Sequence, residues 1–135
     1  ECAKRAMADD FINELSDGYQ TIVGEKGFGL SGGQKQRVSI ARAMLKDAPV
    51  FVFDDSTSAL DAETERKLLE NLMTYYKERT ILIAAHKMSS VVDCDEIIYL
   101  SNGKIVERGT FDELMELDGH FAGVYKTQMA KQTVA

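Results

Sequence analysis

The sequence predicts an α/β fold built around a short parallel sheet. Two continuous apolar runs rich in β-forming residues, at 49–55 and 80–86, are typical of strands buried on both faces of such a sheet. Between them, residues 62–76 carry leucines at helical spacing, with Glu65 among the charged residues assigned to the other sides of the helix. A strand, a helix and a second strand in this order indicate the crossover that joins parallel neighbours.

A hairpin and several helices complete the predicted order of elements. Asn-Gly at 102–103 separates two β-rich runs within 96–109, which favours an antiparallel hairpin with a type I′ turn. Apolar spacing predicts a helix over 2–15 that ends at the turn residues "SDGYQ" of 16–20. Two more helices are predicted later in the chain, one opened by the capping box of Thr110 and Glu113 and one over 119–130.

Composition limits the classes of partner. The 135-residue chain is 44% apolar and 28% charged, as in ordinary globular domains, and no apolar run reaches the ~20 residues that span a bilayer. A formal charge of −6 and a pI near 4.9 argue against nucleic acid, because binding its phosphate backbone relies on clustered Lys and Arg. Cys2 and Cys94 have no paired spacing, so we expect structural thiols in a reducing compartment.

A glycine pair opens the helix predicted for "GLSGGQKQRVSIARAML" at 29–45. Ser31 and Gln34 form the S-x-x-Q pattern of a capping box, which places Gly32 and Gly33 in the first turn. Without Cβ atoms there, an outside group can approach the unpaired amides, and the positive end of the helix dipole suits an anion such as phosphate. Three cations expected to strengthen this field follow in the same helix: Lys35, Arg37 and Arg42. A plain capped helix is the alternative.

Two carboxylates follow the first predicted strand, at the edge where open α/β sheets bind ligands. Asp54 suits Mg²⁺, which prefers oxygen donors and needs few protein ligands when a nucleotide's phosphates also bind it. Asp55 is then placed to orient or deprotonate a water. The alternative is that both acids cap the helix that begins near Ala62. His86 follows the second strand and is expected beside the same crevice, with a purely structural histidine as the alternative.

These segments together resemble the nucleotide-binding domains of ABC transporters, in particular those of exporters. The motifs occur in the family's order: "TIVGEKG" at 21–27 resembles the X-loop, "LSGGQ" at 30–34 the signature motif, "VFVFD" at 50–54 the Walker B strand, "SALD" at 58–61 the D-loop, His86 the switch histidine and "GKIVERGTFDEL" at 103–114 the tail of the domain.

The resemblance implies the C-terminal part of a P-loop NTPase domain with a RecA-like core. Residues 1–46 would form the helical signature subdomain, and residues 47–135 the later part of the core with its hairpin and terminal helices. It also implies ATP and Mg²⁺ as ligands. The expected site residues are Ser31, Gly32, Gly33, Gln34 and Asp61 on the nucleotide, Asp54 on the metal, and Asp55 and His86 as catalytic groups.

The resemblance further implies two partners at the cytoplasmic face of a membrane. A second nucleotide-binding domain, identical or different, would bind head to tail, so that the signature residues face ATP held by that partner. Transmembrane domains would contact residues 21–27. Hydrolysis would then reopen the dimer and drive transport.

Two departures from the family pattern modify these expectations. No G-x-x-x-x-G-K-[ST] motif occurs, so the Walker A loop is missing and this fragment alone is expected to be inactive. The strand at 80–85 should then lack one neighbour and promote association.

Asp55 stands where the family usually has glutamate, and its shorter side chain predicts a weak site, as in one half of a heterodimer. The alternatives are a non-catalytic regulatory half and a soluble ABC ATPase outside transport.

Overall fold

The computed structural model describes residues 1–24 and 29–133, and these form two compact units that are considered separately, 1–84 and 85–135. Residues 25–27 of the predicted X-loop lie outside the described residues. The division predicted between residues 46 and 47 stays a prediction. No helix among the described residues has the length and apolar character needed to cross a bilayer.

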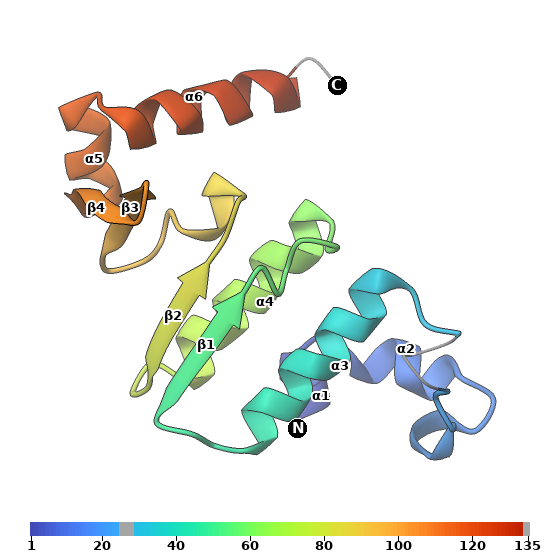
Figure 1. The fold of residues 1–135 in the computed structure, drawn as a ribbon. Coiled ribbons are helices and arrows are strands. Elements are labelled where there is room, and N and C mark those ends of the chain that lie inside the picture. The colour runs from blue at the N-terminus through green and yellow to red at the C-terminus, as the bar shows by residue number, and fades with distance from the viewer. Residues whose placement is uncertain (25–28, 134–135) are drawn as a thin grey trace. The chain divides into compact units, whose positions relative to one another are not determined.

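The first unit contains the predicted parallel pair of strands. Its elements in chain order are α1 Cys2–Arg5, α2 Asp9–Glu14, the 3-10 helix η1 Gly18–Gln20, α3 Gly32–Leu45, β1 Val50–Asp54, α4 Ala62–Tyr75 and β2 Thr80–Ala84. β1 and β2 pair in parallel from Val50 with Thr80 to Asp54 with Ala84, and α4 is the crossover between them (Figure 1). The predicted strand, helix and strand are therefore confirmed.

Burial on both faces of the sheet, which the apolar runs indicated, holds for one face only. Phe51 and Phe53 of β1 are buried in one core with residues of α3 and α4. On the opposite face, Val50, Val52 and Leu82 are 47%, 67% and 55% exposed. Among the described strands, β2 pairs with β1 alone, so its other edge keeps unpaired backbone groups, as expected.

The helix predicted over 2–15 is divided into α1 and α2. Met7 lies at the break with a φ of 58°, a left-handed conformation that a helix interior does not allow. Arg37 of α3 donates to the Met7 carbonyl at 2.6 Å and stacks over the Phe11 ring, so contacts with a distant helix stabilise the break. Local spacing could not show this, because the partner lies 30 residues away.

The assignment of Glu65 to the polar side of α4 is wrong. Glu65 is 3% exposed and accepts a hydrogen bond from Thr57 Oγ1 at 2.6 Å. It lies three residues before Leu68 and seven before Leu72, so helical periodicity places it on the buried side with both leucines.

The second unit contains the hairpin and the last helices. Its elements are the 3-10 helix η3 Met88–Ser90, β3 Ile97–Ser101, β4 Lys104–Gly109, α5 Phe111–Leu117 and α6 His120–Thr133. Asn102 and Gly103 have φ values of 49° and 72°, as a type I′ turn requires, and Thr110 with Glu113 forms the predicted capping box of α5. Ile97, Leu114 and Phe121 form the core of this unit.

Candidate functional site

The first turn of α3 is held open by the predicted capping box. The Ser31 hydroxyl accepts from the Gln34 amide at 3.2 Å, and Gln34 Oε1 accepts from the Ser31 amide at 2.9 Å. These bonds satisfy the amides of the N-cap and of the third helical residue. Gln34, predicted to contact nucleotide, therefore uses its carbonyl oxygen within the chain.

The two amides between these positions keep their capacity for an outside acceptor. Gly32 and Gly33 occupy the first and second helical positions, where no intrahelical partner exists, and no other acceptor for them occurs among the described residues. The first turn has no acidic side chain, so the positive end of the helix dipole is not neutralised there. The arrangement suits a ligand with several anionic oxygens.

The glycines also permit a close approach within the chain. A Cβ on Gly33 would lie 3.0 Å from the Ala59 carbonyl oxygen and 3.3 Å from Leu60 Cδ2, and a Cβ on Gly32 would lie 3.4 Å from Ala59 Cβ. The loop after β1 therefore packs on the first turn of α3. Glycine at position 33 has a structural reason as well as the predicted ligand-binding one.

Asp54 and Asp55 lie at the carboxyl end of β1, as predicted. Both side chains are exposed, and no side-chain hydrogen bond or ion pair reaches either carboxylate among the described residues. Asp55 has a φ of 48°, and its amide donates to the Ala84 carbonyl at 2.8 Å, which extends the contact with β2 by one residue. Aspartate adopts this left-handed conformation more readily than most residues that carry a Cβ.

The alternative in which Asp54 and Asp55 cap α4 is wrong, because Asp61 is the cap. Its carboxylate accepts from the Thr64 amide at 2.9 Å and from Thr64 Oγ1 at 2.7 Å. These hydrogen bonds lower the pKa of Asp61 below its ordinary value. Asp61 follows two residues after Ala59, which packs on the first turn of α3.

The residues at the end of β1 fit a magnesium ion whose other ligands come from a nucleotide. Among the described residues, no three His, Cys, Asp or Glu side chains gather into a complete metal site. Mg²⁺ usually keeps several waters and takes one or two carboxylates plus phosphate oxygens. The exposed carboxylate of Asp54, without an internal partner, meets that limited requirement.

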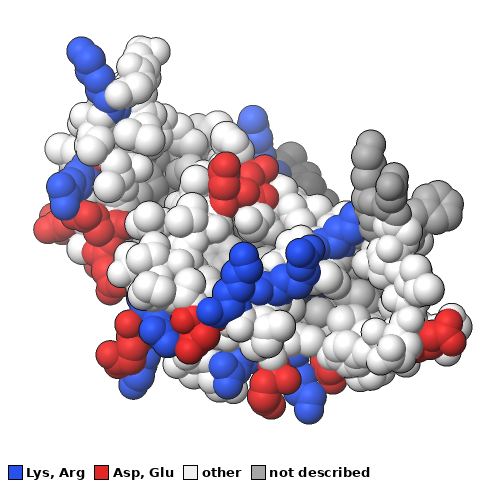
Figure 2. All heavy atoms as spheres, turned by 60° about the horizontal axis from the view of Figure 1, so that its bottom comes forward, with Lys and Arg blue, Asp and Glu red and all other residues white. Residues whose placement is uncertain are grey.

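Two of the three predicted cations lie near the glycines, and the third does not. Arg42 lies in the last turn of α3, about 15 Å along the helix from Gly32, and there it complements the opposite end of the dipole. Arg37 donates from Nε to the Gly33 carbonyl at 3.4 Å as well as to the Met7 carbonyl, so its charge lies beside the glycines, and Lys35 lies exposed in the first turn. Figure 2 shows one face of the molecule, on which basic side chains form a row across the middle and separate acidic groups lie around it.

His86 belongs to the second unit, so its placement beside Asp55 stays a prediction. The ring is exposed, and the backbone carbonyl of His86 accepts from Gln128 Nε2 at 2.7 Å. Gln128 Oε1 also accepts from the Met88 amide at 3.0 Å. Gln128 of α6 thus holds the segment that carries the predicted switch histidine.

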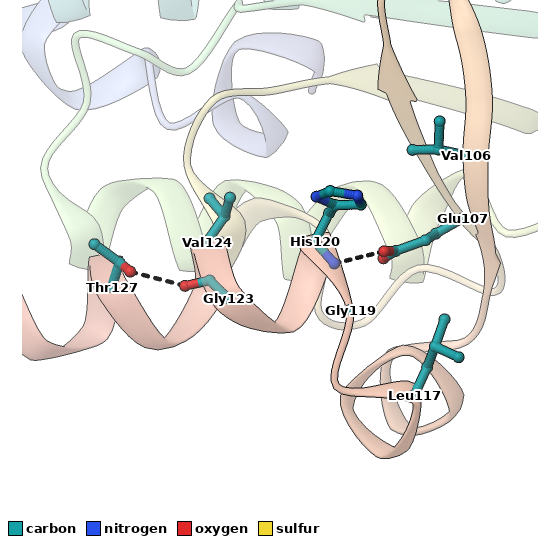
Figure 3. A pocket seen from close by; sticks show the side chains of 8 residues that line it. All are labelled: Val106, Glu107, Leu117, Gly119, His120, Gly123, Val124 and Thr127. Carbon is teal, nitrogen blue, oxygen red and sulfur yellow. Dashed lines mark hydrogen bonds between the residues drawn. The ribbon is translucent and has the colours of Figure 1, made fainter.

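An open hollow in the second unit is a structural feature rather than a ligand site. Glu107 of β4 points from its wall to the start of α6, where one carboxylate oxygen accepts from the His120 amide (Figure 3). The other carboxylate oxygen accepts from the Phe121 amide at 2.9 Å. Glu107 is 8% exposed. The helix N-terminus that could attract an anion here is therefore already occupied by the chain's own carboxylate.

Two residues that organise these regions, Gln36 and Glu107, were absent from the predicted site. The Gln36 amide bonds to the loop after β1 at Ser58 and Ala59. A polar residue on a half-buried side of a helix is the only sequence signal for Gln36, and Glu107, in strand β4, has no comparable signal. Cys2 and Cys94 are free thiols, and burial raises the pKa of Cys94, in keeping with the predicted structural role.

Comparison with known proteins identifies similar sequences. The ABC transporter family model matches residues 2–58. The ATP-dependent lipid A-core flippase of Legionella pneumophila strain Paris is 52% identical over 126 residues, which are 93% of this chain and 21% of the flippase. The flippase of the same name from Escherichia coli K12 is 46% identical over 131 residues, 97% of this chain and 22% of the flippase.

A solved structure agrees over almost the whole chain. A bacterial Atm1-family ABC exporter with ATP bound superimposes with a TM-score of 0.91 at 42% identity, covering 95% of this chain and 23% of the exporter. The chain thus spans about a fifth of the length of the curated relatives it matches.

Proposed function

The chain belongs to the ABC transporter family, and we propose from this that it is part of a nucleotide-binding domain that hydrolyses ATP to drive export across a membrane. The predicted family and the α/β P-loop NTPase fold class are confirmed by the likenesses to the flippases and to the Atm1-family exporter. The observation that carries the proposal is the open first turn of α3, whose amides suit a phosphate, in a chain 52% identical to an ATP-dependent transporter.

The open turn of α3 would bind the terminal phosphate of ATP held by a second nucleotide-binding domain. The amides of Gly32 and Gly33 would donate to phosphate oxygens, and the Ser31 hydroxyl, which accepts from Gln34, still has its own proton to donate. Gln34 and Asp61 would support this contact from the capping box and from the adjacent loop. Such a head-to-tail pair uses one chain at two sites.

The end of β1 would serve the ATP bound by this chain itself. Asp54 would hold Mg²⁺, which neutralises charge on the phosphates. Asp55 would orient a water for in-line attack on the γ-phosphate and accept its proton, while His86 would hold the transferred phosphoryl group by a hydrogen bond. Each role needs an exposed side chain, and all three side chains are exposed.

The rest of the domain would complete the first unit. A strand leading into a phosphate-binding loop would pair with the second edge of β2, and an element packed on the open face of the sheet would cover the exposed Val52 and Leu82. Transmembrane domains would contact residues 21–27, and the whole would lie at the cytoplasmic face of a membrane. The relatives' names support ATP-driven lipid transport as the class of activity.

A second candidate is a half-site that binds ATP with little turnover, and the observation that favours it is Asp55 in place of the family's usual glutamate. The carboxylate of aspartate is withdrawn by about 1.5 Å, and a misplacement of about 1 Å can lower a rate about a hundredfold.

ATP hydrolysis by the full-length protein, alone and with a candidate partner, tests both candidates. We expect measurable turnover, a rise of about tenfold for Asp55→Glu and a loss of most turnover for Asp55→Asn. A wild-type rate equal to that of Asp55→Asn, with ATP binding intact, would favour the regulatory half. Absence of ATP binding would refute both.

A further inference from the structure

One side chain joins the first turns of α3 to the loop that follows β1. Gln36 Nε2 donates to Ser58 Oγ at 2.9 Å, and Gln36 Oε1 accepts from the Ala59 amide at 2.9 Å. A third, longer contact of 3.4 Å runs from Nε2 to the carbonyl oxygen of Asp55. The partners lie between 19 and 23 residues away in sequence, so these bonds are tertiary.

The chemistry of the partners fixes the orientation of the amide. The Ala59 N–H can only donate, so the Gln36 oxygen must face it, and the NH₂ group then faces the Ser58 hydroxyl and the Asp55 carbonyl. A glutamate of the same length would keep the acceptor for Ala59 and could accept from the Ser58 hydroxyl. It would lose the donor for Asp55 and place a negatively charged oxygen beside the Asp55 carbonyl oxygen.

The contact at Asp55 falls on a backbone that needs support. Asp55 has a φ of 48°, which costs energy for a residue with a Cβ. Its amide is held by the Ala84 carbonyl at 2.8 Å, and its carbonyl is held by Gln36. The direction of the Asp55 carboxylate therefore depends on two anchors, one in β2 and one in α3.

Close packing also links the first turn of α3 to the loop that follows β1. Gly33 lies so close to the loop that a Cβ would meet the Ala59 carbonyl oxygen at 3.0 Å, and the Leu60 side chain is buried beside it. A movement of the first turn of α3 must therefore displace Ala59 and Leu60 as well. Gln36 extends this mechanical link from the loop to Asp55.

We propose that Gln36 is a positioning residue for Asp55: its amide fixes the backbone of residues 55–59 on α3 and so sets the direction of the carboxylate that activates water. The proposal rests on the hydrolytic role of Asp55 in the proposed function. It adds that α3 acts on the chain's own hydrolytic site as well as on an outside phosphate.

The test compares three variants of the full-length protein. Gln36→Met keeps the length of the side chain and loses every hydrogen bond, and Gln36→Glu keeps the acceptor. The control is Ser39→Ala, on the exposed side of the same helix. We expect Gln36→Met to lower kcat about tenfold, with KM for ATP changed less than about twofold. Here kcat is the rate per functional nucleotide site, and the number of sites is measured by binding of a non-hydrolysable ATP analogue. Gln36→Glu keeps the acceptor for Ala59 but loses the donor for Asp55, so its kcat should also fall, by at least about threefold, whereas Ser39→Ala should match wild type.

A second measurement follows the contact without relying on hydrolysis. Hydrogen exchange at residues 55–60 should become about tenfold faster in Gln36→Met and stay unchanged in Ser39→Ala, because the Ala59 amide loses its acceptor. Equal kcat in Gln36→Met and Ser39→Ala, or a kcat of Gln36→Glu equal to that of wild type, would overturn the proposal. If wild type binds ATP but does not hydrolyse it, the proposed function fails, and unchanged exchange would then overturn the positioning role separately.

Discussion

The N-termini of α3 and α6 present the same two backbone positions in opposite states. Both helices have 14 residues. At the start of α6, the amides of His120 and Phe121 donate to the two oxygens of Glu107. At the start of α3, the corresponding first and second amides belong to Gly32 and Gly33, which have no internal acceptor among the described residues.

Burial explains why the chain treats the two ends differently. Phe121 is 1% exposed, so an unpaired amide there would lose its water without compensation, at a cost of about 1–3 kcal/mol. Gly32 is exposed, so water or a ligand can satisfy its amide. The carboxylate of Glu107 also shows which chemistry fits a pair of helix amides, namely two anionic oxygens on one atom, as a phosphate provides.

The largest effect is expected when α3 receives an acid of its own. Gly32→Asp places a carboxylate at the open amides, and two like charges about 4 Å apart repel by roughly 4 kcal/mol at an effective dielectric constant of about 20. In the full-length protein we expect ATP turnover at least about tenfold below that of Gly32→Asn, which has the same shape without the charge. Steady-state hydrolysis measures this.

Stability should change in the other direction. An acid in the first turn stabilises a helix by about 0.3–1 kcal/mol, and a Cβ on Gly32 meets only Ala59 Cβ at 3.4 Å. Gly32→Asp should therefore melt no lower than Gly32→Asn. Equal turnover in the two variants would contradict an anion at α3.

The second prediction removes the acid from α6. Glu107→Ala leaves two amides without acceptors at a buried helix end, so we expect the opening free energy of α6 to fall by about 3 kcal/mol. Glu107→Gln keeps one acceptor and should lose about 1 kcal/mol. Hydrogen exchange of the α6 amides in the full-length protein measures both.

The neighbouring Arg108 gives the control. Its guanidinium pairs with Glu96 at 2.7 Å, but 62% and 45% of the two side chains is exposed, so Arg108→Ala should change exchange little. A loss for Arg108→Ala as large as that for Glu107→Ala would mean that the cap contributes nothing specific.

The features that the sequence predicted correctly are those set by near neighbours. The capping boxes of α3 and α5 join residues three positions apart, and the type I′ turn depends on Asn102 and Gly103 themselves. The strands and α4 follow from runs of apolar side chains. Each of these patterns lies within a few neighbouring residues, so it can be identified in the sequence without knowledge of the fold.

The features that the sequence did not predict depend on distant partners. The break at Met7 is stabilised by Arg37, the Gln36 bonds reach Ser58 and Ala59, and Glu107 reaches α6 across 13 residues. In the sequence, a polar residue that bonds to a distant partner has the same local pattern as a polar residue that faces solvent. The predicted site residues of the first unit gather near α3 and β1, and their chemical roles stay predictions.

The smallest effects are expected at two glycines near the start of α6, where substitution by alanine should change the stability of the helix in opposite directions. A Cβ on Gly119 would overlap the Glu107 carboxylate that caps α6, so Gly119→Ala must displace the cap and should cost about 1–2 kcal/mol. A Cβ on Gly123, one turn further on, meets nothing within 4 Å, so Gly123→Ala should stabilise α6 by roughly 0.5–1 kcal/mol. Hydrogen exchange of the α6 amides in both variants measures the difference. The added methyl group should speed exchange in Gly119→Ala and slow it in Gly123→Ala. Stabilisation by both would show that helix propensity alone governs α6, and that Glu107 is dispensable as its cap.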